Sequence, residues 1–121
     1  MTGAARFSGH QVIVTGGGSG IGEATCRLFA SEGAKVTVLD RRADAAERVA
    51  AEIDGRAEVV DVRKADAVNA AVRRSAEAMG GLTDLVNNAG VGVAKSLLDT
   101  TDADWALMLG VNLSGTFHGI R

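Results

Sequence analysis

The sequence predicts an α/β fold built on a parallel β-sheet, and two features lead to this prediction. Short apolar runs rich in β-branched residues alternate along the 121 residues with longer segments in which apolar residues recur at helical spacing. Such alternation is typical of strand–helix–strand units with right-handed crossovers. In addition, a glycine-rich stretch, TGGGSGIG, lies where the first apolar run must turn directly into the first helical segment.

Four strands are expected from the apolar runs. They cover residues 12–14, 36–39, 59–60 and 85–86. Each run is short and nearly continuous in apolar side chains, as expected of parallel strands that are covered on both faces.

Helices are expected between these strands, each with an apolar stripe. Gly33, Gly55 and the pair Gly80-Gly81 follow the first three stripes, at the positions where helices commonly end. A fourth helix is expected from Thr100 onward, with a broad apolar face. The first three stripes consist of Ile21, Ala24, Thr25, Leu28 and Phe29, then Ala46, Val49, Ala50 and Ile53, then Val68, Ala71, Val72, Ala76 and Met79.

The composition narrows the class of protein. With 46% hydrophobic residues, 23% charged residues and a net charge of −2, the chain has no basic excess that would attract nucleic acid or an anionic membrane. It has no apolar run long enough to span a bilayer and no signal-peptide pattern, so a cytoplasmic protein is expected. The single Cys26, expected to be a small buried hydrophobe, and two distant histidines predict neither a disulfide nor a metal site.

The glycine-rich stretch has two interpretations, a flexible linker or a loop that binds phosphate. Its position favours the second, because the free N–H groups and the positive dipole end of the following helix attract an anion. Gly16 is expected to turn the chain off the strand, Gly20 to let a pyrophosphate approach the backbone, and Gly22 to let the helix pack closely on the sheet. The G-x-x-x-G-x-G spacing, with no Lys-Ser/Thr after it, predicts a dinucleotide rather than ATP or GTP.

Asp40, at the end of the second strand, predicts which dinucleotide binds. It lies 18 positions beyond Gly22, close to the spacing of about 20 for an acid that accepts hydrogen bonds from the adenosine ribose. A carboxylate there repels a 2′-phosphate, so Asp40 and the non-basic Ser19 favour NAD over NADP, whereas Arg41-Arg42 would suit a 2′-phosphate. The alternative for Asp40 is an ordinary acid in a turn.

With these pieces in place, the sequence resembles the short-chain dehydrogenase/reductase family over almost the entire chain. The matching motifs are Thr15 to Gly22, Asp40, Asp61-Val62, Asn87 to Gly90 and Asn112, in the family's order. The resemblance implies one domain over residues 1–121, the first half of a Rossmann-like doubly wound sheet with four strands in the order 3-2-1-4 and helices on both faces.

The resemblance also implies roles for single residues. Asp61 would bind the adenine amino group, with the backbone of Val62 against the ring; the alternative for Asp61 is to cap the third helix. The segment from Asn87 to Gly90 would be held by Thr15, tie the central strands together and leave room for a ribose. The dinucleotide is thus expected to contact Gly16, Ser19, Gly20, Ile21, Gly22, Asp40, Arg41, Asp61, Val62, Asn88, Ala89 and Gly90.

The catalytic part of the family pattern is incomplete in this sequence. Asn112 resembles the asparagine of the family's tetrad, which helps to hold a water in a proton relay; the alternative is a buried structural asparagine. The serine and the Tyr-x-x-x-Lys pair have no counterpart, and the sequence contains no tyrosine.

Three interpretations of the chain therefore stay open. The first is the cofactor-binding half of an NAD(P)-dependent oxidoreductase for alcohols or carbonyls, inactive alone. The others are a non-catalytic nucleotide-binding module that assembles with a partner, and a complete enzyme that has lost its C-terminal half. The resemblance and the exposed apolar edge of the fourth strand predict a homo-oligomer.

Overall fold

Strands and helices alternate along the chain, as expected. The computed structural model describes residues 5–89, 101–103 and 106. The strands are β1 (Gln11–Thr15), β2 (Lys35–Asp40), β3 (Arg56–Val59) and β4 (Asp84–Val86), and the helices are α1 (Gly20–Ser31), α2 (Ala43–Ile53) and α3 (Ala65–Met79). All strand pairs are parallel and their order is β3-β2-β1-β4, which confirms the predicted class and topology.

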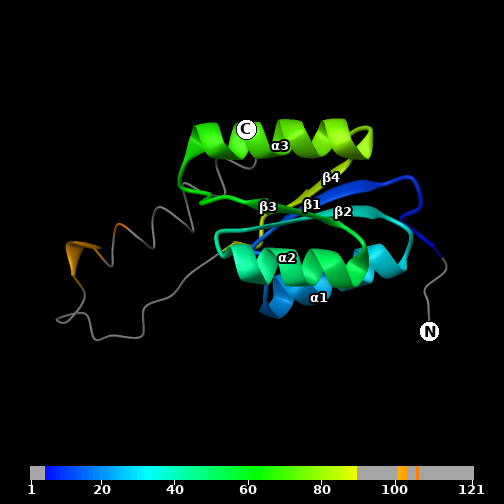
Figure 1. Cartoon of the computed structure of the whole chain (residues 1–121), viewed down its shortest axis with the longest axis horizontal. Coiled ribbons are helices and arrows are strands. Elements are labelled where there is room, and N and C mark those ends of the chain that lie inside the picture. Colours follow the sequence, from blue (N-terminus) through cyan, green and yellow to red (C-terminus); the bar gives the residue numbers. More distant parts are fainter. Residues whose placement is uncertain (1–4, 90–100, 104–105, 107–121) are drawn as a thin grey trace.

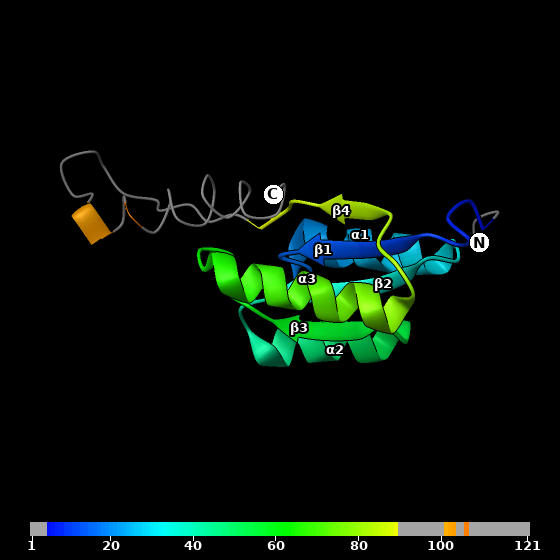
Figure 2. The ribbon, with the colours of Figure 1, turned by 90° about the horizontal axis from the view of Figure 1, so that it is seen from above.

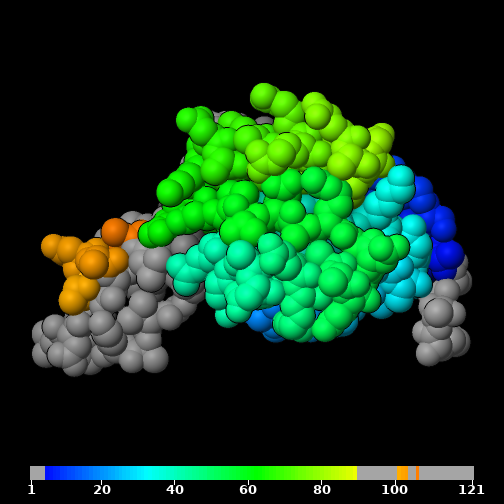
Figure 3. All heavy atoms as spheres, in the orientation of Figure 1, coloured from blue at the N-terminus to red at the C-terminus, as the bar shows by residue number. Residues whose placement is uncertain are grey.

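The helices cover both faces of the sheet. Figure 1 shows α3 on one face and α1 with α2 on the other, and Figure 2 shows the four strands side by side from β4 to β3. In the space-filling view, α2, β3 and α3 form one continuous surface (Figure 3). The chain runs from β1 through α1 to β2 and through α2 to β3, and the crossover from β3 through α3 then returns it to the other side of β1, where β4 pairs, so β1 lies between β2 and β4.

Alternation along the strands creates two apolar cores. Val12 and Val14 face α1 and α2, whereas Ile13 faces α3, and all three are fully buried. The first core consists of Val12, Val14, Cys26, Val36, Val38, Ala46, Val49 and Ala50. The second consists of Ile13, Leu39, Val60, Val62, Val68, Ala71 and Met79. The strands are therefore held from both faces by the burial of β-branched side chains.

The third strand differs from the prediction of residues 59–60. It begins at Arg56, and Val60 lies just beyond its end, still buried. The charged residues Arg56 and Glu58 hid its first half from a search for apolar runs. The Glu58 carboxylate is buried because it accepts hydrogen bonds from Arg56 (3.1 Å) and from Arg74 on α3 (2.7 Å).

The predicted buried stripe of α1 is wrong in part. Ile21 and Leu28 are 78% and 57% exposed, whereas Gly22 and Cys26 are the buried positions of this helix. The helix lies so close to the sheet that small residues face it, and Ile21 and Leu28 are turned outward, whereas Phe29 of the expected stripe packs against the first core. Cys26 is a buried hydrophobe as expected, and burial raises the pKa of its thiol to about 12.

The three expected glycine positions at helix ends are confirmed. Gly33 follows the C-cap Glu32 of α1, Gly55 follows the C-cap Asp54 of α2, and Gly80 caps α3. Gly33 and Gly80 have left-handed backbone conformations, whereas at the end of α2 this conformation is adopted by Asp54, with φ of 55°. No helix within residues 5–89, 101–103 and 106 is long and apolar enough to cross a membrane.

Candidate functional site

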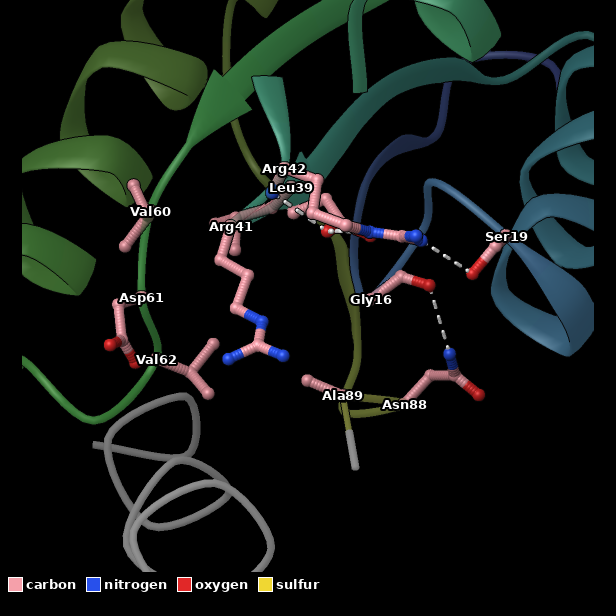
Figure 4. Close-up of a pocket in the computed structure, with 11 residues that line it drawn as sticks. Gly16, Ser19, Leu39, Arg41, Arg42, Val60, Asp61, Val62, Asn88 and Ala89 are labelled. Carbon is pink, nitrogen blue, oxygen red and sulfur yellow. Dashed lines mark hydrogen bonds and ion pairs between the residues drawn. The ribbon is translucent and has the colours of Figure 1, made fainter. Parts of the chain in front are cut away.

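A cleft of about 250 Å³ opens at the carboxyl ends of the strands. The ends of β1, β2 and β3 and the segment after β4 contribute to it because parallel strands present their carboxyl ends at one edge of a sheet. Figure 4 shows its lining residues. Eight of them were predicted as cofactor contacts from sequence: Gly16, Ser19, Asp40, Arg41, Asp61, Val62, Asn88 and Ala89.

The other predicted residues lie elsewhere. Gly20, Ile21 and Gly22 belong to the first turn of α1 beside the cleft and do not line it. Gly90 and Asn112 lie outside the described residues. Leu39, Arg42 and Val60 line the cleft without having been predicted as contacts.

The glycine-rich loop passes under the segment that follows β4. Gly16 has a φ of +67°, and a Cβ there would lie 2.9 Å from the Cα of Ala89. A Cβ on Gly22 would clash with the carbonyl oxygen of Gly16 and lie 2.5 Å from the Nδ2 of Asn88. Beside Gly20, in contrast, no described atom lies within 4 Å of the position of a Cβ. The loop is thus packed on its inner side and open at Gly20.

The first turn of α1 borders this open side. Its N–H groups have no acceptor within the helix, since the first four N–H groups of any α-helix lack one. Ser19 precedes the helix in an extended conformation and its hydroxyl does not cap it. A helix N-terminus with free N–H groups beside an open glycine is the arrangement that accommodates a phosphate group.

Thr15 joins the loop to the segment after β4. Its hydroxyl oxygen accepts hydrogen bonds from the N–H groups of Asn88 (2.9 Å) and Ala89 (3.0 Å), and the hydroxyl donates to the carbonyl of Val86 (3.3 Å). The Asn88 side chain donates to the carbonyl of Gly16 (3.2 Å). The expectation that Thr15 holds this segment is confirmed.

Asp40 fixes the opposite wall of the cleft. The residue is only 7% exposed, and its carboxylate oxygens accept hydrogen bonds from the backbone N–H groups of Gly18 and of Arg42, each at 3.0 Å. Asp40 therefore makes the turn contacts of the alternative interpretation and also lines the cleft. Each carboxylate oxygen can accept more than one hydrogen bond, so its backbone contacts leave capacity for ligand hydroxyls.

The two arginines after Asp40 behave differently. The Arg42 guanidinium donates to the Ser19 hydroxyl (2.9 Å) and lies 3.7 Å from Asp40, across the mouth of the loop. The guanidinium of Arg41 points into the cleft toward Val62 and Ala89 (Figure 4). Among the described residues, the Arg41 side chain has no hydrogen-bond or ion-pair partner, and it lines the cleft.

Asp61 lies at the far end of the cleft and is paired with Arg63. The Arg63 guanidinium donates to Asp61 Oδ2 at 2.6 Å, and the Arg63 N–H donates to Oδ1 at 3.0 Å. These bonds hold the pKa of Asp61 below its usual value, chiefly through the side-chain hydrogen bond. The capping alternative for Asp61 is wrong, because α3 is preceded by Lys64 and begins without a side-chain cap.

Sequence reasoning missed a second layer of charges behind the loop. Arg48 on α2 donates to the carbonyl of Gly18 (3.2 Å) and to Glu23 Oε1 (3.0 Å), and Arg27 also pairs with Glu23 (2.8 Å). These hydrogen bonds, from Arg48 first, lower the pKa of Glu23 to about 2. The helical spacing of Glu23 and Arg27 predicts their pair, but nothing local predicts that Arg48 reaches the loop. In the part of the chain that the structure describes, no three His, Cys, Asp or Glu side chains gather as metal ligands.

Comparisons with known proteins match this geometry. A family model described as short chain dehydrogenase matches residues 10–121. The chain is 43% identical over 121 residues to the NADP-dependent (R)-specific alcohol dehydrogenase of Lentilactobacillus kefiri, and 42% identical over 113 residues to the meso-2,3-butanediol dehydrogenase of Serratia marcescens. These alignments cover 96% and 91% of the chain but 48% and 45% of the two relatives, so the chain spans about half of their length.

A solved structure shares the fold. The 3-ketoacyl-(acyl-carrier-protein) reductase from Brucella melitensis, crystallised in complex with NADH, superposes with a TM-score of 0.92 at 36% identity. The match covers 95% of this chain and 48% of the reductase. The similarity thus extends over the whole sheet and its cleft.

Proposed function

The chain belongs to the short-chain dehydrogenase family, and on this premise we propose that it is the NAD-binding half of an oxidoreductase that acts on alcohol or carbonyl groups. The observation that carries the proposal is the cleft itself. One edge of the sheet brings together a glycine loop at a helix N-terminus, a strand-end carboxylate and the segment after β4.

The residues present suit a dinucleotide. The pyrophosphate would lie against the N–H groups of the first turn of α1, at Gly20, Ile21 and Gly22, where the loop is open. The Asp40 carboxylate would accept hydrogen bonds from the hydroxyl groups of the adenosine ribose. When bound, NAD supplies a hydride acceptor for an alcohol, or NADH a hydride donor for a carbonyl.

The remaining lining residues complete this assignment. Asp61 would accept a hydrogen bond from the adenine amino group, and Val62 would contact the adenine ring. Asn88, Ala89 and Gly90 would border the second ribose, because Thr15 and Gly16 hold this segment at the mouth of the cleft. Asn112 would serve the proton relay of the complete enzyme.

The choice of NAD over NADP rests on Asp40. A 2′-phosphate would lie beside a carboxylate that is nearly buried and already fixed by two backbone N–H groups, and so cannot turn away. The Arg41 guanidinium would attract the 2′-phosphate of NADP. Its side chain is exposed, however, and an ion pair in contact with water contributes little to binding. The proposal is therefore an NAD preference moderated by Arg41.

This preference is tested by calorimetric titration of the chain with NAD and with NADP. Asp40→Asn removes the charge and keeps the shape, and it is expected to lower the ratio of NAD to NADP affinity about tenfold, a change of about 1.4 kcal/mol. A ratio is used because damage to the loop affects both cofactors alike. Asp44→Asn, an exposed acid in the first turn of α2, is the matched control and should leave the ratio unchanged. An unchanged ratio in Asp40→Asn would refute the assignment.

We also propose that this chain alone does not catalyse hydride transfer. The sequence contains no tyrosine, and in the family pattern that residue exchanges the proton with the substrate oxygen. We further propose that the complete enzyme is cytoplasmic and assembles as a homo-oligomer. The exposed apolar residues Ile21 and Leu28 on α1 are consistent with a further contact surface.

A further inference from the structure

We propose that Arg48 is a positioning residue for the glycine-rich loop, which it holds from behind by binding the carbonyl oxygen of Gly18. The inference rests on the proposed dinucleotide function of that loop. Arg48 lies on α2, does not line the cleft, and therefore would act on a ligand only through the loop.

Gly18 is held on both sides of its α-carbon. Its N–H donates a hydrogen bond to Asp40 Oδ2 at 3.0 Å, and its carbonyl oxygen accepts a hydrogen bond from Nη2 of Arg48 at 3.2 Å. The two partners come from the end of β2 and the middle of α2, so the loop is fixed against two separate elements. The carbonyl of Gly18 belongs to the same peptide unit as the N–H of Ser19, which points the opposite way. Fixing this carbonyl also fixes the direction of the first N–H before α1.

A loop this rich in glycine needs such fixation more than an ordinary loop does. Glycine loses more backbone entropy on ordering than any other residue, and the stretch 16–22 has five glycines. If the loop were free, part of the binding energy of a pyrophosphate would be spent on ordering it. The Arg48 bond orders it before the ligand arrives.

Glu23 in turn orients Arg48. The same Nη2 that reaches Gly18 donates to Glu23 Oε1 at 3.0 Å, and Nη1 lies 3.4 Å from Glu23 Oε2. A planar guanidinium held by a carboxylate on one side retains few orientations, so its remaining hydrogen bond is well directed.

Arg27 provides a matched control because it shares every partner of Arg48 except the loop. It also donates to Glu23 and pairs with Glu52, the second acid contacted by Arg48. Both side chains are about half exposed, at 40% and 48%. Arg27→Gln and Arg48→Gln therefore remove the same charge from the same network, and only the second removes the bond to Gly18.

The experiment measures two quantities on wild type, Arg27→Gln, Arg48→Gln and Arg48→Lys. The first is the Kd for NAD by calorimetric titration; the second is the exchange rate of the Gly18 amide by NMR without ligand, with the Val14 and Val38 amides reporting global unfolding. In Arg48→Gln we expect a Kd raised about fivefold and a Gly18 amide that exchanges about fivefold faster, given the usual size of a half-exposed charged hydrogen bond. Arg27→Gln should leave both quantities near wild type, and Arg48→Lys should restore them in part.

Each outcome bears on the inference. Equal effects in the two glutamine variants would overturn it, because charge balance around Glu23 would then explain the data. Unchanged Gly18 exchange in Arg48→Gln would overturn it as well, even while wild-type NAD binding sustains the proposed function. If wild type does not bind NAD, the proposed function fails, and the Gly18 exchange rates still decide whether Arg48 holds the loop.

Discussion

At the scale of single residues, Gly16 and Gly22 define the shape of the cleft because they lack side chains. A Cβ on Gly22 would clash with the carbonyl oxygen of Gly16, and the Nδ2 of Asn88 donates to that same carbonyl. The three groups therefore meet at one crowded point beneath the loop. Gly20 differs, since it has a left-handed backbone but open space around it.

This contrast predicts different costs for two alanine substitutions. Gly22→Ala should destabilise the chain by roughly 3 kcal/mol, because backbone atoms at the crowded point must move apart. Gly20→Ala should cost about 1 kcal/mol, the strain of a left-handed alanine, with no clash. Urea unfolding of both variants measures the difference. Equal stability losses would mean that the helix does not rely on close approach at Gly22.

At the scale of elements, ion pairs join α1 to α2 on the outer face of the first core. Glu23 and Arg27 on α1 contact Arg48 and Glu52 on α2, so two acids and two arginines alternate between the helices. Exposed pairs of this kind contribute little singly, and a network holds its members at a lower entropy cost for each bond. The network joins the two helices behind the glycine loop.

The network predicts an acid-sensitive part of the stability. Hydrogen bonds from Arg48 and Arg27 lower the pKa of Glu23 from 4.5 to about 2, so the folded chain holds this proton less tightly than the unfolded chain. The contribution of Glu23 is thus complete above pH 4.5 and is lost as the pH falls through this window to about 2. The difference in unfolding free energy between wild type and Glu23→Gln should shrink across the window.

An exposed acid on α2 serves as the control for this measurement. Glu47 has no ion pair among the described residues, and Glu47→Gln should follow the wild-type pH dependence of unfolding. A Glu23→Gln variant with the same pH dependence as wild type would show that the network does not form in solution.

At the scale of the whole molecule, the sheet, the two cores and the cleft form one cooperative arrangement around β1. The strand lies between β2 and β4, its side chains enter both cores, and its last residue, Thr15, organises the cleft. A ligand in the cleft would contact the loop, the ends of β2 and β3 and the segment after β4 together. Binding is therefore linked to global folding rather than to the order of one loop.

This linkage predicts that NAD stabilises the chain without being turned over. At an NAD concentration one hundredfold above Kd, the free energy of unfolding should rise by about 2.7 kcal/mol. Thermal unfolding with and without NAD measures this, and AMP at a matched occupancy tests whether the adenosine part suffices. With NAD and a secondary alcohol, no NADH absorbance should develop, because the sequence has no tyrosine. Measurable turnover would show that another residue exchanges the proton.

Much of this architecture follows from local sequence patterns. β-Branched runs, helical periodicity and glycines at strand and helix ends act over a few residues, and they determined the order of elements, the parallel sheet and the place of Gly16 and Asp40 at its edge. The place of Asp61 in the cleft was implied by the family resemblance. Local patterns failed where burial depends on a distant partner. Glu58 is buried through Arg74, 16 residues away, and Ile21 is exposed because α1 approaches the sheet through Gly22.

The sequence by itself determined the α/β class with its parallel sheet and which strand ends and glycines form the cleft edge, because those properties depend on apolar periodicity and on the backbone demands of glycine. Only the tertiary structure decided which arginines serve the loop. Arg41, Arg42 and Arg48 are the same residue type within one short stretch of sequence, yet their side chains have different partners. Arg41 points into the cleft, Arg42 binds the Ser19 hydroxyl, and Arg48 binds the carbonyl of Gly18, which lies 30 residues earlier in the chain. Long side chains can reach many partners, and the packing of α1 against α2 selects among them.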